Sequence, residues 1–364
     1  MKRPTKEGKA IKLRIDQNRS RTEKKRKNIK GPRIPVPATK GYYGSKIDAP
    51  EAISIYSPES QAFKDTIIFI DNVRNTFGPS KKVIDFSSTR SMTAAAMAML
   101  YCELELARGD NKFKGIIVWS DSHQINKIIK KTGISKIIFG SETSFDISTI
   151  EELPIISSHD TELMDEVCDH VIKKCYDEDL APQELASREA TLSSAVAETV
   201  DNVCFHAYDR DEKIPKRWWL CCHIIDEMLY LAIYDYGVGI PTTARNHAWF
   251  LDILKEERPE LFKEAELTIG GSKKTLLDKI SGKINDSDAI YISMIDDFSE
   301  TEKRKHGQGS KSIKDLVNKS ENGKLWIFSG KGMYKFEREE DHPQLCTLSS
   351  KIPGTLIQWN IKLS

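Results

Sequence analysis

A glutamate and an asparagine four residues apart, Glu198 and Asn202, are the pair in this sequence best suited to chemistry on a bound ligand. Residues with this spacing lie on one face of an α-helix, separated by about 6 Å along its axis. The amide oxygen of Asn202 suits a Mg²⁺ ion that is held mainly by water and phosphate oxygens. The carboxylate of Glu198 could orient or deprotonate an attacking water or hydroxyl.

The helix that would carry this pair is predicted to begin near Pro182 and to continue to His206, which extends the polar stripe by one more turn. Residues on its other faces are expected to be apolar and to pack into a core: Leu192, Ala195, Val196, Thr199, Val203 and Phe205. The pattern indicates an amphipathic helix. Its polar face is either part of a site or an ordinary solvated surface.

A β-hairpin is predicted after this helix. Strands over residues 216–225 and 229–236 are separated by Asp226 and Glu227, which suit a turn. The second strand ends at Asp235, directly before Gly237 and Gly239. Such a carboxylate either belongs to an ordinary turn or faces a ligand that the glycines allow to approach the backbone.

A third polar segment, His306-Gly307-Gln308-Gly309-Ser310-Lys311, precedes a predicted helix over residues 312–318. Glycines at the start of a helix direct backbone N–H groups and the positive end of the helix dipole toward phosphate. Lys311 either adds a phosphate contact or is simply solvated.

Taken in order, the three segments resemble the N, G1 and G2 boxes of the GHKL ATPases, the class that includes DNA gyrase, heat-shock chaperones and histidine kinases. The resemblance implies an α/β protein whose residues 155–364 form an α+β two-layer sandwich, the Bergerat fold. It also implies that ATP and Mg²⁺ bind there, and that residues 241–306 form a mobile lid over the nucleotide.

The same resemblance implies individual roles. Asn202 would bind Mg²⁺, Glu198 would act on the attacking group, and Asp235 would accept a hydrogen bond from the adenine amino group. Thr355 belongs to a Gly-Thr pair that resembles the closing element of the family, whose hydroxyl meets phosphate or water. Ser310 departs from the family pattern, which usually has leucine or methionine at that position.

Residues 61–145 show a second pattern, in which predicted strands over 81–87 and 114–119 alternate with predicted helices ending near 107 and 132. This alternation is typical of an α/β layer. The segment resembles a STAS domain, the fold of bacterial anti-anti-sigma factors, and a generic βαβ unit is the alternative. Ala94 and Ala95 occupy the family's serine positions. The resemblance therefore implies a docking or sensing unit that lacks the phosphate acceptor.

A STAS-like unit beside a GHKL-like unit resembles the partnership of sporulation-type anti-sigma kinases with their substrates. The favoured function is an ATPase that acts as a regulatory switch, with a protein partner or self-association. A Ser/Thr protein kinase and a non-catalytic nucleotide-binding module are the alternatives. Glu198 argues against the last of these, because a module without catalysis has no need for a carboxylate there.

The composition of the 364-residue chain limits its class. Its length allows two domains with cores of their own. The sequence has no apolar run of membrane-spanning length and no signal peptide, so we expect a cytoplasmic protein. Seven cysteines without metal-ligand spacing indicate free thiols.

Positive charge is concentrated at the N-terminus. Residues 1–33 contain 14 Lys or Arg and 3 Asp or Glu, and residues 34–364 carry a net charge of −10. We expect residues 1–60 to form a basic, disordered leader. Its charge could bind nucleic acid or another polyanion, or it could be only a solubilising tail.

Overall fold

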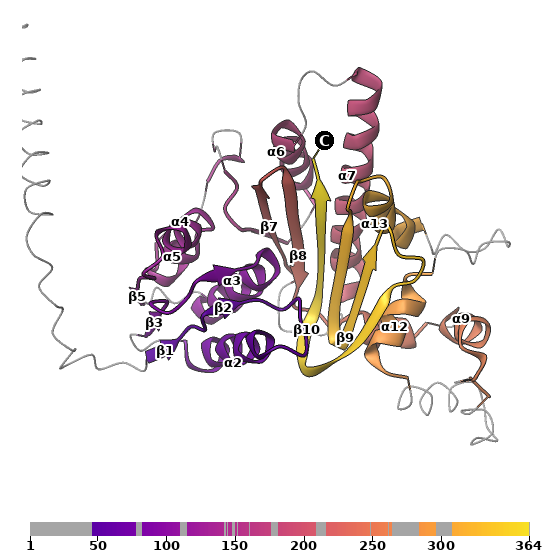
Figure 1. The fold of residues 1–364 in the computed structure, drawn as a ribbon, viewed down its shortest axis with the longest axis horizontal. Coiled ribbons are helices and arrows are strands. Elements are labelled where there is room, and N and C mark those ends of the chain that lie inside the picture. The colour runs from indigo at the N-terminus through magenta and orange to yellow at the C-terminus, as the bar shows by residue number, and fades with distance from the viewer. Residues whose placement is uncertain are drawn as a thin grey trace, which may run out of the picture. The chain divides into compact units, whose positions relative to one another are not determined.

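A computed structural model describes most of the chain beyond its N-terminal region, namely residues 46–77, 82–109, 115–141, 143, 145–147, 150, 152–159, 161–175, 181–208, 216–247, 249–260, 262–263, 284–295 and 308–363. Gly44–Ser364 form one compact unit, and all elements described below belong to it. The mixture of helices and strands in this unit places it in the α/β class (Figure 1).

The N-terminal part is built on a small parallel sheet. Its strands lie in the order β1 (Lys46–Asp48), β3 (Val83–Asp85) and β5 (Ile116–Val118). A second, two-stranded parallel sheet pairs β2 (Ala52–Ile53) with β4 (Ser91–Met92). The helices of this part are α2 (Gln61–Thr76), α3 (Ala94–Arg108), α4 (His123–Lys131) and α5 (Ile134–Ile138). The predicted alternation of strands and helices is therefore confirmed.

The boundary of the basic leader was predicted too far along the chain. Residues 46–53 contain two strands, because Ile47 and Ile53 are apolar and buried against the sheet and its helices. Residues 1–45 lie outside the described residues. The end of the leader is therefore no later than residue 45.

The C-terminal part contains a five-stranded antiparallel sheet. Its strands lie in the order β6 (Ile156–Ser158), β7 (Trp218–Ile225), β8 (Met228–Asp235), β10 (Gln344–Lys362) and β9 (Lys324–Glu337). The predicted hairpin is present, with Asp226 and Glu227 both at positive φ in its two-residue turn. Positive φ at both central residues matches the right-handed twist of the flanking strands.

Helices cover one face of this sheet. They are α6 (Met164–Cys175), α7 (Pro182–Asn202) and α13 (Gln308–Asn318), and a π-helical turn, Val203–Ala207, continues α7. Their apolar side chains share a core with one set of alternating sheet residues, which includes Trp218, Leu231 and Trp359. The helix predicted near Pro182 is confirmed, as is burial of most of its apolar positions.

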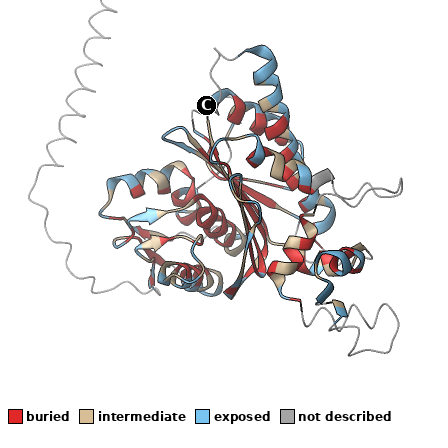
Figure 2. Cartoon of the chain, turned by 45° about the vertical axis from the view of Figure 1, so that its right-hand side comes forward, coloured by how far each residue is buried: buried red, intermediate tan, exposed pale blue. Residues whose placement is uncertain are grey.

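The other face of the sheet is also apolar, with Trp219, Tyr234 and Phe328 fully buried there. Because side chains alternate between the faces of a strand, a sheet that is apolar on both needs a cover on both. α3 packs on this second face, and every residue from Ala94 to Leu104 is buried. The C-terminal sheet therefore lies between two helical layers and is not part of a simple two-layer sandwich (Figures 1 and 2).

The predicted lid contains three further helices in its described residues: α8 (Ile240–Arg245), α9 (Trp249–Glu257) and α12 (Asp286–Ser293). They share a small core that includes Phe250 and Leu254. Asp286 anchors α12 to β9, because its Oδ2 accepts a 2.6 Å hydrogen bond from the Lys331 N–H, and its Oδ1 pairs with Arg245 at 2.9 Å. These parts of the lid are packed helices, whereas residues 264–283 and 296–307 lie outside the described residues.

Candidate functional site

A cavity of about 360 Å³ opens between α7, the end of β8, the middle of β10, the helices of the predicted lid and α13. Seven of the residues predicted for the site line it: Glu198, Asn202, His206, Asp235, Gly239, Ser310 and Thr355. They come from four separate stretches of the chain. The fold therefore brings most of the predicted residues to one place.

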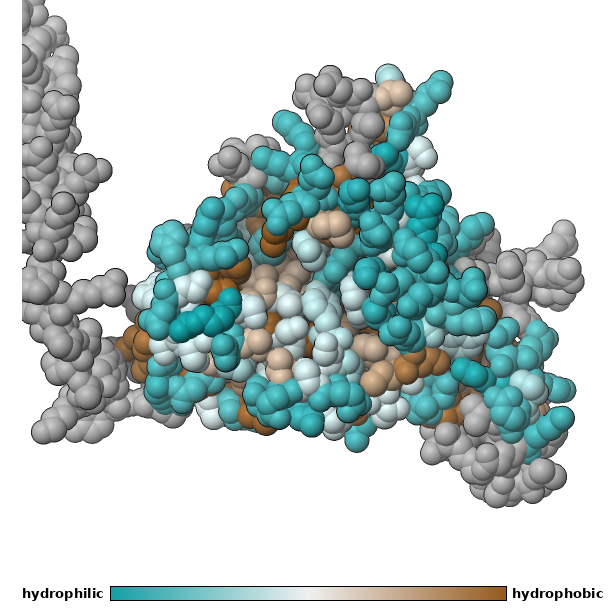
Figure 3. Space-filling view, viewed as in Figure 1, coloured by the Kyte–Doolittle hydropathy of each residue, from teal (hydrophilic) through white to brown (hydrophobic). Residues whose placement is uncertain are grey.

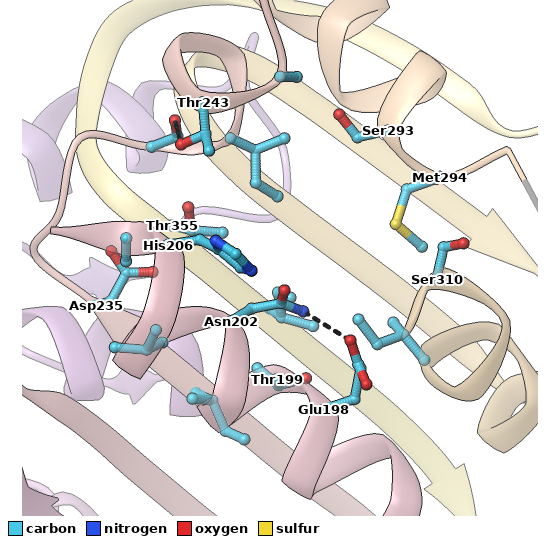
Figure 4. A pocket seen from close by; sticks show the side chains of 18 of the residues that line it. Glu198, Thr199, Asn202, His206, Asp235, Thr243, Ser293, Met294, Ser310 and Thr355 are labelled. Atoms are coloured by element: carbon cyan, nitrogen blue, oxygen red, sulfur yellow. Dashed lines mark hydrogen bonds between the residues drawn. The ribbon is translucent and has the colours of Figure 1, made fainter. Parts of the chain in front are cut away.

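The polar stripe of α7 forms one wall (Figure 4). The Asn202 amide nitrogen lies 3.4 Å from Oε1 of Glu198, a long hydrogen bond. Burial, followed by the charge of Asp201, raises the pKa of Glu198. A carboxylate with a raised pKa is a stronger base than an exposed one, so this residue is suited to activating a bound water or hydroxyl.

His206 reaches the same cavity from the π-helical turn that follows α7. Such turns are rare and are often found at functional sites. The wider turn changes the direction of the residues after Asn202. Phe205, which we expected in the core, is 71% exposed instead. It follows Glu198 by seven residues, or about two helical turns, and therefore falls near the polar side of the helix even with regular α-helical spacing.

Asp235 is the most buried ionisable group of the cavity, with 4% of its surface exposed. Its Oδ1 accepts a 2.7 Å hydrogen bond from the Gly237 N–H. Burial raises the pKa of Asp235 to about 7, and hydrogen bonds from Gly237 and Thr355 oppose this shift. No ion pair of Asp235 is found within the described part of the chain. The carboxyl group thus remains able to hydrogen-bond a ligand.

Gly237 does not line the cavity, although we predicted it for the site. A Cβ atom on this residue would lie 2.0 Å from the Ala207 carbonyl oxygen, so only glycine fits between β8 and the π-helical turn. The neighbouring Val238 N–H donates a 2.7 Å hydrogen bond to the same oxygen. The loop after β8 is therefore fastened to the end of α7, which places Asp235 beside Asn202.

Thr355 lies opposite Asp235 in the register of β10 and β8. Its hydroxyl is 3.3 Å from that of Ser329, which is fully buried on β9. The Ser329 hydroxyl accepts from the Ile240 N–H at 3.0 Å and donates to the Gly354 carbonyl at 2.7 Å. Ser329 thus connects three segments around the cavity, and nothing in its local sequence marks it for that role.

The third predicted segment, residues 306–311, contributes fewer residues to the cavity than expected. Ser310 is buried and lines the cavity, whereas Lys311 is exposed and does not. Gly309 lies in the first turn of α13, which begins at Gln308 and thus earlier than predicted. His306 and Gly307 lie outside the described residues.

The helices of the predicted lid supply cavity residues that sequence reasoning missed: Thr243, His247, Trp249, Ser293 and Met294. The rings of His247 and Trp249 stack with their centroids 5.6 Å apart and an angle of 13° between their planes. These residues follow no motif, because their position depends on how α8, α9 and α12 fold back over the sheet.

Within the described residues no group of three or more His, Cys, Asp or Glu side chains is placed to hold a metal ion. Mg²⁺ needs no such group, since it keeps several waters and takes one or two protein ligands in addition to substrate phosphates. The amide oxygen of Asn202 is therefore compatible with Mg²⁺ that arrives with a nucleotide.

Comparison with models of protein families gives no match, and comparison with curated proteins gives none either. None of the described helices has the length and apolar character needed to cross a membrane.

Proposed function

We propose that the cavity binds Mg-ATP and that the chain is a GHKL-type ATPase, with a Bergerat-like arrangement in its C-terminal part. The observation that carries this proposal is the order of the groups along the cavity. Asp235 lies on one side, Glu198 and Ser310 lie on the other, and Asn202 lies between them (Figure 4). A nucleotide has a corresponding order, from its base through its sugar to its phosphates.

Asp235 would recognise the base. A nearly buried carboxylate needs several hydrogen-bond donors, and the adenine amino group would add one to those of Gly237 and Thr355. Gly239, at φ +86°, allows the backbone to pass closely along this end of the cavity. The volume of about 360 Å³ falls in the range of roughly 300–1,000 Å³ found for small-molecule sites.

Asn202 and Glu198 would serve the phosphate end. Asn202 would bind Mg²⁺, and the ion would neutralise phosphate charge there. Glu198 would orient the attacking water, and its raised pKa suits this role. The Ser310 hydroxyl and the first turn of α13 would face the phosphates, in agreement with the preference of anions for helix N-termini.

The N-terminal part would act as the docking or sensing unit of the switch. Its parallel β1-β3-β5 sheet with flanking helices supports the STAS-like interpretation. Its α3 touches the ATP-site sheet directly, since Glu105 accepts a 2.6 Å hydrogen bond from Trp219 and pairs with Arg217 at 3.0 Å. Strand β7 contains Trp219 and directly follows Arg217, and its first residue, Trp218, pairs with Asp235 of β8.

The experiment is incubation of the full-length chain with Mg²⁺ and γ-labelled ATP, with the label followed into free phosphate and into protein. Release as free phosphate is expected. Label on a polypeptide would instead identify a protein kinase, and ATP binding without turnover would identify a non-catalytic module. Absence of any calorimetric signal for Mg-ATP would refute the nucleotide site itself.

A further inference from the structure

A second cavity, of about 670 Å³, lies where the N-terminal part meets α6 and the end of β7. Its walls come from the start of α3, from α4, from α6 and from the tip of the β7–β8 hairpin. It shares no lining residue with the candidate nucleotide site. On β8 the two cavities are at opposite ends, since Tyr230 lines the second and Asp235 the first.

Positive charge surrounds this cavity. Lys127 and Lys131 of α4 and Lys174 of α6 line it, and Glu152 is the acidic residue among its lining side chains. Glu152 forms an ion pair with Lys131. Burial and the nearby Lys174 lower the pKa of His170, which also lines the cavity. This local excess of cations contrasts with the net charge of −10 on residues 34–364.

The lining of the cavity is largely apolar by area and includes Met97, Ile128, Ile224 and Ile225. Ile224 and Ile225 remain 40% and 49% exposed, which is unusual for neighbouring large aliphatic side chains. Figure 3 shows that such apolar areas are small among the hydrophilic side chains of the face it draws. An apolar ligand would cover these side chains and remove their surface from water.

Two residues that line the cavity have a buried polar atom without a hydrogen bond in the described part of the chain. They are His223, at Nε2, and Tyr56, at its hydroxyl. Buried side-chain nitrogen and oxygen atoms usually have a partner in the protein or in ordered water. Burial lowers the pKa of this histidine, so its neutral ring offers either a donor or an acceptor to a ligand.

We propose that this second cavity binds an amphiphilic organic anion, with an aliphatic body against the apolar side chains of α3, α4 and the end of β7 and a carboxylate or phosphate head near Lys127 and Lys174. A small molecule is favoured over a protein segment because the volume and the mainly apolar lining area are those of a small-molecule site. The lysines supply the specificity for an anionic head, since hydrogen bonds to charged groups are stronger than those between neutral groups. The site is independent of the proposed nucleotide site.

Calorimetric titration of the full-length chain at low salt tests the assignment, with dodecanoate, dodecyl phosphate and dodecanol as probes below their micelle concentrations. We expect one molecule of dodecanoate or of dodecyl phosphate to bind per chain. The anion that binds more tightly shows whether the site favours a carboxylate or a phosphate head. Dodecanol should bind at least about tenfold more weakly, as expected for loss of a charged hydrogen bond. Lys127→Glu and Lys174→Glu should each weaken anion binding to a similar extent, whereas Lys64→Glu, on the exposed face of α2, should not.

Three results would overturn the proposal. Equal affinity for dodecanol and dodecanoate, or unchanged affinity in both cavity lysine variants, would show that no anion site exists there. Loss of dodecanoate binding in Asp235→Asn would place the probe in the nucleotide cavity instead. Retention of dodecanoate binding by that variant, together with loss in the lysine variants, would support the second site whether or not ATP binds.

Discussion

Gly354 lies directly against Asp235, and a Cβ atom added to Gly354 would come within 1.9 Å of the Asp235 carbonyl oxygen. Gly354 also has a φ of +66°. The two residues lie far apart in sequence, and β8 and β10 bring them together. The position of the buried carboxyl group therefore depends on the absence of a side chain on the neighbouring strand.

Replacement of Gly354 by alanine should destabilise the protein strongly, because it combines a backbone contact with an unfavourable φ. We expect a loss of roughly 3 kcal/mol or more in the free energy of unfolding. Gly133→Ala is a matched control, since Gly133 also has positive φ, in the left-handed helical region, but its added Cβ would be 3.6 Å from the nearest atom. That control should cost only about 1 kcal/mol. Similar denaturant midpoints for the two variants would contradict the close contact.

Asp235→Asn should weaken ATP binding while the fold is retained. The asparagine oxygen can still accept from the Gly237 N–H, but its amide nitrogen replaces an acceptor by a donor. A lost hydrogen bond to a charged group corresponds to about 1–3 kcal/mol, or roughly 5- to 150-fold in Kd. Calorimetric titration with Mg-ATP measures the change. Identical affinities of the variant and the wild type would exclude Asp235 from base recognition.

The stability of the nucleotide-free protein should decrease as pH rises through the titration of Asp235. The pKa of this group is about 7 in the folded protein and 3.8 in its ordinary environment, so the folded state binds more protons between these values. Its stabilising contribution is complete below pH 3.8 and is lost by about pH 7. The loss is on the order of 4 kcal/mol. Comparison of wild type with Asp235→Asn in urea at pH 5 and pH 8 isolates this contribution, and a pH-independent difference would contradict it.

Glu198→Ala should abolish turnover and leave ATP affinity almost unchanged, because the proposed role of the carboxylate is in the transition state. Phosphate release and calorimetric binding are measured on the same preparation. Glu189→Ala, on the same helix but outside the cavity, serves as the control and should keep full activity. Continued phosphate release by Glu198→Ala at the wild-type rate would remove this residue from the mechanism.

Deletion of residues 1–33 should not affect ATP binding, because the described residues that line the cavity all lie between 198 and 357. It should remove any affinity for RNA or DNA that comes from the positive charge of the leader. That affinity should decrease steeply between low and moderate salt, as expected when counterions are released. Retention of nucleic acid by the truncated protein would show that the leader is not its binding site.

The sequence alone determined the features that depend on neighbours along the chain. The period of α7 placed Glu198 and Asn202 on one face, and the pattern of residues 216–236 predicted both strands of the hairpin and its turn. Cys221 and Cys222 are neighbours in β7 and belong to different cores, as the alternation of side chains along a strand requires. The helical period, the alternation of side chains along a strand and the residues of a turn are sufficient to predict such features.

Only the tertiary structure decided which distant segments meet. The pairing of Asp235 with Thr355, the central position of Ser329 and the stacked rings of His247 and Trp249 follow from strand register and helix packing. The cover of α3 on the second face of the sheet has the same origin. Such contacts form because they bury apolar surface over the whole unit. The free energy gained depends on the buried area and on how well the side chains pack, and neither can be read from residue spacing within one segment.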